Sequence, residues 1–230
     1  MKIGAIIQAR ITSNRFPGKV LHNIAGKPML QYLLERVGRC ASIDDIVVAT
    51  SRDQSDIQIT DFCKKIGVAY HRGPLLDVAG RFREVLNKYK FDGFVRITGD
   101  SPLLDPELIS KGMKIFRQGR VEIVTNVFKR TYPAGQSVEI LNSGTFIRAY
   151  EEIRDPEDLE HVTKFFYKNS ERFKIFNFVA EADYSAINLS VDTPQNMELI
   201  AAIIRDMEKP HWEYGVRDVL ERYNKAMLSF

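Results

Sequence analysis

The amino-acid sequence predicts an α/β fold in which a mainly parallel sheet is covered by helices on both faces. Short apolar runs alternate with helical patterns through the first half of the chain, and this order is typical of parallel strands joined by crossover helices. The chain has 230 residues, of which 44% are apolar and 27% are charged. A chain of this size and composition can bury a sizeable core, so we expect residues 1–230 to form a single domain.

The first strands and helices are defined by the spacing of apolar residues. Residues 3–9 form an apolar run that predicts a buried strand, and residues 28–39 carry apolar side chains on one helical face. Residues 45–51 predict the second strand. The helical pattern that follows ends at Gly67, because glycine readily takes the left-handed conformation that ends helices. Residues 67–71 predict the third strand.

Two further strands complete the alternating half of the chain. Residues 81–89 predict a helix, and residues 93–100 predict the fourth strand. Asp105 and Pro106 mark the start of the next helix, because aspartate is a favoured N-cap and proline fits the first helical position. Residues 121–126 predict the fifth strand.

The pattern changes after about residue 128. Residues 128–137 predict a loop, and residues 138–143 and 173–180 predict strands. A helix between these strands begins at an Asp-Pro pair and covers residues 155–167. We interpret residues 128–180, with approximate bounds, as an excursion within the domain.

Residues 181–207 predict a return to the main sheet. A strand at residues 189–191 precedes a helix for which Thr193 is the N-cap and Pro194 the first residue. Residues 214–223 predict a terminal amphipathic helix.

Polar segments follow four of the predicted strands, at residues 8–19, 51–52, 71–81 and 98–102. The carboxyl ends of parallel strands meet at one edge of a sheet, so we expect these segments to converge there. Ligands of open α/β sheets bind outside this edge. The sequence therefore predicts the functional site at the carboxyl ends of the strands.

Composition and charge indicate a cytoplasmic protein. The net charge is only +3, from 33 basic and 30 acidic residues, so we expect no nucleic-acid partner. No apolar run is long enough for a membrane span, and we expect no membrane association. Cys40 and Cys63 lack the CxxC spacing and indicate buried thiols in a reducing compartment.

The loop after the first strand carries three cations. Arg10, Arg15 and Lys19 lie close together, with Gly18 before the lysine and no acidic residue between them. Arginine forks and a lysine ammonium suit a polyphosphate. The loop matches neither the Walker A motif, in which a hydroxyl residue follows the lysine, nor the GxGxxG motif. The pattern alone leaves open a solvated surface loop.

Asp100 and Asp192 each follow a predicted apolar strand. If the strand ends meet, the two carboxylates lie near one point although they are far apart in the sequence. Two carboxylates opposite a polyphosphate can hold Mg²⁺, which takes its remaining ligands from phosphates and water. Each aspartate also precedes a predicted helix, so helix capping is the alternative role for each.

His161 lies in a helical pattern, where a single histidine is more often structural. The sequence contains no HExxH metal motif and no Ser/His/Asp order that would support covalent catalysis.

Several segments together resemble the sugar-activating cytidylyltransferases, the family of the KDO (3-deoxy-manno-octulosonate) and acylneuraminate CMP-transferases. The branch they resemble most is SpsF-like, named for spore coat polysaccharide biosynthesis. The segments are QARITSNRFPGKVLHNIAGKPML, VVATS, VRITGDSPLLDPELI, TYPAGQSVEI, EHVTKFFYKNSERF and VDTPQNMELI. The resemblance implies a Rossmann-like α/β domain of the nucleotide-diphospho-sugar transferase type, in which the excursion contributes to the sugar pocket and to a homodimer contact.

The resemblance also implies an activity and assigns residues to it. The activity is Mg²⁺-dependent transfer of CMP from CTP to a sugar, with release of pyrophosphate, in surface polysaccharide precursor synthesis. The catalytic residues would be Arg10, Lys19, Asp100 and Asp192, with the two aspartates binding magnesium. The nucleotide-binding residues would be Ala9, Arg10, Ser13, Arg15, Lys19, Arg72, Arg81, Thr98 and Gly99. The sugar-binding residues would be Tyr132, Gln136, Glu139 and His161.

Two other functions stay open at this point. One is a nucleotidyltransferase that uses another NTP with a sugar phosphate, and the other is a non-catalytic nucleotide-sugar binding protein. The acceptor also stays open, because Ser137 and Leu159 stand where the family often has an acid and a base.

Overall fold

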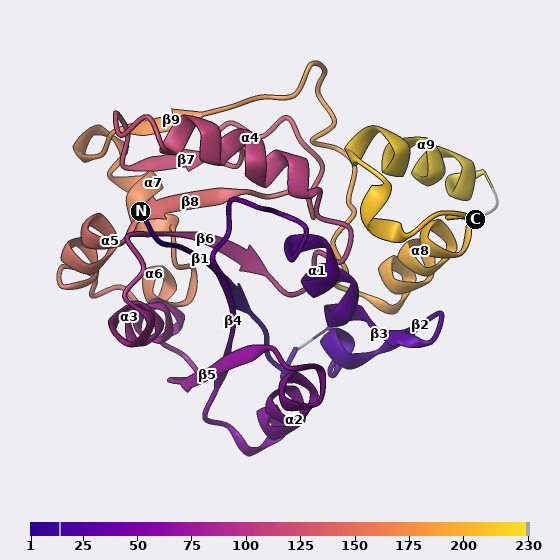
Figure 1. Ribbon diagram of the computed structural model, residues 1–230, viewed down its shortest axis with the longest axis horizontal. Helices are drawn as coiled ribbons and strands as arrows, with labels where there is room; N and C mark the ends of the chain where they lie inside the picture. The colour runs from indigo at the N-terminus through magenta and orange to yellow at the C-terminus, as the bar shows by residue number, and fades with distance from the viewer. Residues whose placement is uncertain (14, 229–230) are drawn as a thin grey trace.

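The computed structural model describes residues 1–13 and 15–228, and within them seven strands form one sheet (Figure 1). Their order is β5-β4-β1-β6-β8-β7-β9. The strands are β1 (Ile3–Gln8), β4 (Asp45–Ser51), β5 (Ala69–Gly73), β6 (Gly93–Thr98), β7 (Ile123–Thr125), β8 (Glu139–Asn142) and β9 (Ile175–Asn177). Neighbouring strands are parallel except where β8 pairs with β6 and β7. The predicted α/β fold with a mainly parallel sheet is confirmed.

Helices cover both faces of this sheet. They are α1 (Met29–Val37), α2 (Ile57–Ile66), α3 (Val78–Tyr89), α4 (Pro106–Phe116), α5 (Ser143–Tyr150), α6 (Pro156–Glu160), α7 (Lys164–Lys168), α8 (Pro194–Arg205) and α9 (Val216–Met227). Helices α1, α2, α4 and α8 share a core with Ile7 of β1, whereas α3, α5 and α7 share a second core with Ile6. Successive strand residues point to opposite faces, so β1 is buried on both.

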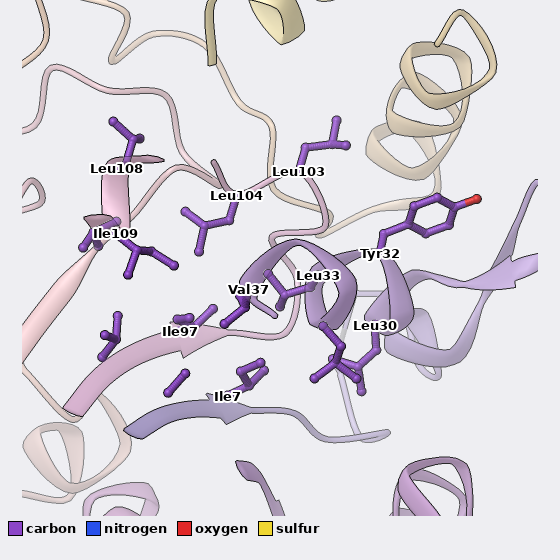
Figure 2. Close-up of a cluster of buried hydrophobic side chains, with 14 of the residues drawn as sticks. Ile7, Leu30, Tyr32, Leu33, Val37, Ile97, Leu103, Leu104, Leu108 and Ile109 are labelled. Carbon is purple, nitrogen blue, oxygen red and sulfur yellow. The ribbon is translucent and has the colours of Figure 1, made fainter. Parts of the chain in front are cut away.

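Figure 2 shows part of the first core, in which α1 packs over the central strands. Leu33 and Val37 of α1 lie above Ile7 of β1 and Ile97 of β6, and each of these side chains is at most 1% exposed. Burial of such side chains contributes roughly 1.5–3 kcal/mol each. The packing thereby fixes β1 and β6, whose carboxyl ends carry the polar segments singled out above.

The helix boundaries follow the predicted capping residues. The side chains of Asp105 and Asp155 each accept a hydrogen bond from the backbone N–H two residues on, at 2.8 and 2.9 Å. Thr193 forms a capping box at the start of α8. Gly67 ends α2 in the left-handed conformation, with φ of 71°.

The prediction of a strand at residues 189–191 is wrong. The bridge made near this segment joins Ala134 to Asn188, outside the strands of the main sheet. The backbone N–H of Val191 donates to the carbonyl of Asp100 at 2.9 Å, so the segment still lies beside the end of β6. Asp192 therefore reaches the sheet edge from a loop.

The helix predicted over residues 155–167 is interrupted. Helix α6 ends at Glu160 and α7 begins at Lys164, because His161 leaves helical geometry with φ of −102° and ψ of 57°. Helix α5 and the small hairpin of β2 (Asn23–Ile24) and β3 (Lys27–Pro28) were not predicted. Helix α5 begins with the residues Ser-Gly-Thr, which have low helix propensity, and is instead capped by Asn142.

Residues 128–180 do not stand apart from the sheet, because β8 lies between β6 and β7 and β9 is the edge strand beside β7. The role of this segment in a dimer contact stays a prediction. Over the described residues, none of the helices combines the length and the apolar character that crossing a membrane requires.

Candidate active site

A cleft of about 430 Å³ opens at the carboxyl ends of β1 and β6. Most of the residues predicted to handle a nucleotide or metal line it: Ala9, Arg10, Ser13, Arg15, Lys19, Arg81, Thr98, Gly99, Asp100 and Asp192. His161 lines it as well. The prediction that the strand-end segments converge is therefore confirmed for residues 8–19 and 98–102 and, through Val78 and Arg81, for residues 71–81, whereas residues 51–52 do not line the cleft. Asp192 joins them from the segment before α8.

The loop after β1 is anchored. The backbone N–H of Ile11 donates to the Asp56 carboxylate at 2.7 Å, and the N–H of Gly18 donates to the carbonyl of Ile11 at 2.9 Å. Gly18 takes the left-handed conformation, with φ of 75°, and leads into a short 3-10 turn that begins at Lys19. Lys19 is only 8% exposed. The alternative of a solvated surface loop therefore does not describe this lysine.

The Lys19 ammonium lies between the two aspartates predicted to bind metal. Its Nζ is 2.9 Å from Asp192 Oδ1 and 3.7 Å from Asp100 Oδ2, and it donates to the carbonyl of Val191 at 2.6 Å. Arg15 adds a second cation, with its Nη2 3.0 Å from Asp192 Oδ2. The two carboxylates thus approach a single point that a positive charge occupies.

Neither aspartate caps a helix. The N-cap of α4 is Asp105, and the N-cap of α8 is Thr193. Asp100 instead accepts a hydrogen bond from the Ser101 hydroxyl at 3.1 Å. Both aspartate side chains keep a little over a quarter of their exposure, so both carboxylates face the cleft. The capping alternative raised by the sequence is excluded for both.

Gly99 lets the ends of β1 and β6 come together. Its N–H donates to the carbonyl of Gln8 at 2.8 Å, and a Cβ at this position would lie 3.0 Å from that carbonyl oxygen and 3.1 Å from the Ala9 Cβ. The loop that carries Asp100 therefore packs directly on the loop that carries Arg10.

Arg10 has an acidic partner across the cleft. Its Nη2 lies 3.3 Å from Oε1 of Glu160, the last residue of α6. Both side chains are about 40% exposed, so the pair is weak. The cations at positions 10, 15 and 19 thus each face a carboxylate within the described residues.

A second, smaller cavity of about 230 Å³ adjoins the cleft. Arg96, Thr98 and Asp100 line both. The other residues around the smaller cavity are Ser101, Val127, Arg130, Ala134, Gly135, Ser137, Glu139 and Ser190. Of the four residues predicted to bind the sugar, Glu139 lies here and His161 lies in the larger cleft.

Glu139 is a buried carboxylate with strong partners. Arg96 Nη1 lies 2.5 Å from its Oε2, and the Tyr167 hydroxyl donates to its Oε1 at 2.6 Å. Burial by itself would raise the pKa of Glu139, but the charge and hydrogen bond of Arg96 and the Tyr167 hydrogen bond outweigh it, so the pKa is lowered. Burial, followed by the Glu139 charge, raises the pKa of Tyr167 well above its usual value.

Tyr132 and Gln136 do not line either cavity. The Gln136 side chain is fully buried, donates to the carbonyl of Leu103 at 2.7 Å and accepts from the N–H of Asp105 at 2.9 Å. Tyr132 is 5% exposed and lies in the first core. Both side chains are committed to packing and backbone hydrogen bonds, so the structure corrects their assignment to the sugar.

The two other predicted arginines differ in their positions. Arg72 is outside the cleft, where it donates to the carbonyls of Ser51 and Asp53. Arg81 lines the cleft, but the residue is only 1% exposed and its guanidinium donates to backbone carbonyls, including Ala49. Burial lowers the pKa of Arg81 to about 10, so it stays charged at neutral pH. The hydrogen bonds of Arg81 thus stabilise the backbone that forms the cleft wall, and those of Arg72 stabilise the backbone at the end of β4.

The sequence reasoning missed Arg96, Arg130 and Glu160. A signal for Arg96 was available, since residues 96, 98 and 100 alternate along one side of a strand that ends at the predicted site. Glu160 and Arg130 lie in loops or at a helix end whose positions depend on tertiary packing, and no local pattern indicates them.

The fold and this site define an α/β protein with a cleft at the carboxyl edge of its sheet that presents cationic side chains and two neighbouring carboxylates. The chain belongs to the cytidylyltransferase family, whose family model matches residues 4–209. It is therefore an enzyme of the nucleotidyltransferase class.

Relatives of known structure and sequence agree with this. A cytidylyltransferase from Leptospira borgpetersenii superposes with a TM-score of 0.94 at 31% identity, over 99% of this chain and 96% of that one. The spore coat polysaccharide biosynthesis protein SpsF of Bacillus subtilis is 31% identical over 86% of this chain and 84% of its own length. A CMP-KDO synthetase solved with CTP shares the fold, with a TM-score of 0.67 at 20% identity over 89% of this chain and 99% of that one.

Proposed function

We propose that the protein transfers the cytidylyl group of CTP to a hydroxyl group of a sugar and releases pyrophosphate, with Mg²⁺ as cofactor. The observation that carries this proposal is the position of the Lys19 ammonium, 2.9 Å from Asp192 and 3.7 Å from Asp100, in a cleft that also presents Arg10 and Arg15. Lysine and arginine at a strand end suit the phosphates, and paired carboxylates suit the cation.

The triphosphate would exchange partners with the acidic side chains. Arg10 would leave Glu160, Arg15 would leave Asp192, and both would turn to phosphate oxygens. The Lys19 ammonium would move by a short rotation of its side chain toward the β- and γ-phosphates. Cations placed in this way stabilise the charge that builds up on the departing pyrophosphate.

Asp100 and Asp192 fit a magnesium ion. Their carboxylates approach one point, they are hard oxygen donors, and Mg²⁺ commonly takes only one or two protein carboxylates beside phosphates and water. No cluster of three or more His, Cys, Asp and Glu residues suited to a metal occurs in residues 1–13 and 15–228, so the other ligands of the proposed ion would be phosphate oxygens and water. When bound, the ion would neutralise phosphate charge and hold the phosphates in one geometry.

The smaller cavity is the place for the acceptor. It opens from the same wall as the cleft, through Arg96, Thr98 and Asp100. A sugar acceptor is supported by relatives that carry the name 3-deoxy-manno-octulosonate cytidylyltransferase, such as the one from Geobacter sulfurreducens, 35% identical over about half of this chain. The name of SpsF supports a role in polysaccharide precursor synthesis.

The reaction then needs no covalent enzyme intermediate. The acceptor oxygen forms a bond to the α-phosphorus of CTP, the bond from that phosphorus to the bridging oxygen of the β-phosphate breaks, and pyrophosphate leaves with the electron pair. The acceptor hydroxyl loses its proton to water or to a neighbouring carboxylate. The protein contributes by positioning and by fixed charges.

The experiment that tests the proposal is a pyrophosphate-release assay with each of the four NTPs against a panel of sugar acids and sugar phosphates. We expect release with CTP and at least one acceptor, and its loss on addition of EDTA. The Asp100→Asn variant provides the background. Release with another NTP in preference to CTP would contradict the nucleotide assignment, and no release above background would contradict catalysis.

We further propose that the enzyme acts as a homodimer in the cytoplasm, where CTP is made. The edge strand β9 supports the dimer, because Phe176 is 42% exposed on it and Val179 is 50% exposed just beyond it. Light scattering coupled to size-exclusion chromatography tests the oligomeric state, and a mass of 26.4 kDa would contradict the dimer.

A further inference from the structure

Arg96 lies in the wall that the cleft and the smaller cavity share. It belongs to β6, which runs between β1 and β8 (Figure 1). Thr98 follows it two residues on along β6, as strand periodicity requires, and Asp100 follows in the loop beyond the strand; both also line the two spaces. Among the residues that line the two spaces, Arg96 is therefore the arginine that could face both a nucleotide in the cleft and an acceptor in the cavity.

The Arg96 guanidinium is held from two neighbouring strands. Its Nε donates to Gln8 Oε1 of β1 at 3.2 Å, and its Nη1 donates to Glu139 Oε2 of β8 at 2.5 Å. Arg96 and Glu139 are directly opposed in the antiparallel ladder of β6 and β8. A planar guanidinium fixed at two of its nitrogens can no longer turn freely, so the direction of the third is set.

The third nitrogen, Nη2, is the one available for a ligand. The hydrogen bonds of Arg96 to side chains in the described part of the chain use Nε and Nη1, and the side chain keeps 15% of its exposure. Glu139 is the carboxylate that opposes Arg96. A second arginine, Arg130, lines the smaller cavity with them. Asp100 lines the same cavity, and once the proposed Mg²⁺ compensates its charge, one buried carboxylate beside two arginines leaves this wall attractive to an anion.

We propose that Arg96 is a catalytic residue whose Nη2 donates a hydrogen bond to a non-bridging oxygen of the α-phosphate of the bound nucleotide. This inference rests on the proposed function. If the nucleotide fills the cleft and the acceptor fills the cavity, the phosphorus that passes between them lies at their common wall. A donor fixed in advance at this point stabilises the charge on the phosphoryl group in the transition state.

The test uses the two diastereomers of CTPαS, which carry sulfur in place of one or the other non-bridging α-oxygen. Their binding to the 230-residue protein is measured by calorimetry in the presence of Mg²⁺ and needs no acceptor. We expect the wild type to prefer one diastereomer by roughly 5- to 20-fold, because sulfur is a poor acceptor for a charged donor. Arg96→Lys and Arg96→Gln should reduce this preference to within about two-fold.

Arg130→Gln is the matched control, because Arg130 lines the smaller cavity and not the cleft. It should keep the wild-type preference. Arg96→Gln leaves the Glu139 carboxylate buried without its cation. A double variant that adds Glu139→Gln replaces both charged side chains by neutral amides, so no unpaired charge is left buried. Thermal unfolding of each variant shows whether it is folded.

A turnover measurement separates this inference from the proposed function. With an acceptor found in the panel, the Arg96 variants should lose roughly 10²–10³-fold in kcat while KM for CTP changes only a few-fold. If the wild type binds CTP but never turns over, the proposed function fails while the diastereomer test still decides the inference. Variants of Arg96 that fold and keep the wild-type preference overturn the inference. A wild type that shows no preference, or that does not bind CTP, also overturns it.

Discussion

Lys19 is central to the electrostatics of the candidate site because its ammonium lies close to two carboxylates at once. Its ammonium is buried against Asp100 and Asp192, and a second cation, Arg15, reaches the same Asp192. An ammonium in this position keeps two like charges from facing each other without compensation. When a triphosphate and a metal ion bind, the ion would compensate the two aspartates and the phosphates would compensate Lys19 and Arg15. Each charged side chain therefore has a partner of opposite charge both before and after the substrate binds.

The first prediction concerns the two residues of the Lys19–Asp100 contact. Lys19→Ala should lower kcat/KM by roughly 30- to 1000-fold, or about 2–4 kcal/mol, because a donor to the leaving phosphates is lost. Asp100→Asn should lower turnover by at least that much, since an amide is a poorer ligand for a hard cation. Steady-state pyrophosphate release measures both effects.

The control for this prediction is Arg72→Gln, at an arginine that the structure leaves outside the cleft. It should change kcat/KM by less than about three-fold. Full activity of Asp100→Asn in a folded protein would remove Asp100 from the metal site. A Lys19→Ala variant that loses only substrate affinity would mean that the lysine binds the ground state and the transition state equally.

The second prediction concerns Glu160, which faces Arg10 across the cleft at 3.3 Å. Glu160→Gln should tighten CTP binding by roughly two- to five-fold, because an exposed ion pair worth up to about 1 kcal/mol no longer competes with the phosphates. Calorimetry with CTP measures the Kd. The comparison is Glu157→Gln, an exposed acid on the same helix whose partner is Lys164. Weaker binding by Glu160→Gln would show that Glu160 itself contacts the nucleotide.

Residue types at strand ends could be predicted, but their burial could not. Lys19 and Asp100 could be singled out because they follow apolar strands whose carboxyl ends meet at one edge, whereas Asp192 was assigned to this edge through a strand that the structure does not contain. Tyr132 and Gln136 were misplaced because a polar residue in a loop has the same appearance in the sequence whether it faces a ligand or a buried carbonyl. The Gln136 amide in fact serves Leu103 and Asp105.

At the level of elements, strands and helices with strong local signals were predictable and contacts between loops were not. The spans of β1, β4 and α4 follow from apolar runs and an Asp-Pro cap. Residues 189–191 have the same apolar character as a strand but lie against the loop of residues 134–135, outside the main sheet. Only tertiary contacts distinguish these two outcomes.

The third prediction tests that loop contact through Gly135. This glycine has φ of +87°, and a Cβ on it would lie 2.6 Å from the carbonyl carbon of Leu189. Gly135→Ala should therefore push the segment that precedes Asp192 away and lower the free energy of unfolding by roughly 2–4 kcal/mol. It should also reduce turnover by at least about ten-fold, because Asp192 would be displaced from its position in the cleft.

Gly119→Ala is the matched control. Gly119 has a similar φ of +70°, but nothing lies within 4 Å of its Cβ position. This variant should show only the cost of the left-handed conformation, about 1–2 kcal/mol, with normal turnover. Urea unfolding measures the stability of both proteins. Equal losses in the two variants would mean that backbone strain accounts for the effect and that contact with Leu189 does not.

In the whole molecule, α1 ties the carboxyl-terminal part of the chain to the sheet. Arg36 of α1 is fully buried and donates to the carbonyls of Leu104, His211 and Tyr214. Burial lowers the pKa of Arg36 to about 10, so it stays protonated at neutral pH. One arginine thus connects the loop after β6 to the segment between α8 and α9. These hydrogen bonds stabilise the loop after β6, which carries Asp100.

The last prediction is the pH dependence of stability, in which His211 is central. His211 is buried, its Nε2 lies 2.7 Å from Glu35 Oε2, and burial lowers its pKa below the usual 6.5 even though Glu35 opposes the shift. The unfolded chain therefore binds more protons than the folded one below about pH 6.5, so stability falls as the pH decreases through this range. The lowered pKa values of Glu35 and Glu139 act with the same sign below about pH 4.5.

Urea unfolding between about pH 8 and pH 4 should therefore show a constant stability above roughly pH 7, a first decline below about pH 6.5 and a steeper one below about pH 4.5. His211→Gln should abolish the first decline and leave the second, because the group that titrates in the first window is gone. His22→Gln, at an exposed histidine, should keep the wild-type profile. If the first decline persists in His211→Gln, the site that couples acid to unfolding lies elsewhere than between α1 and the carboxyl-terminal helices.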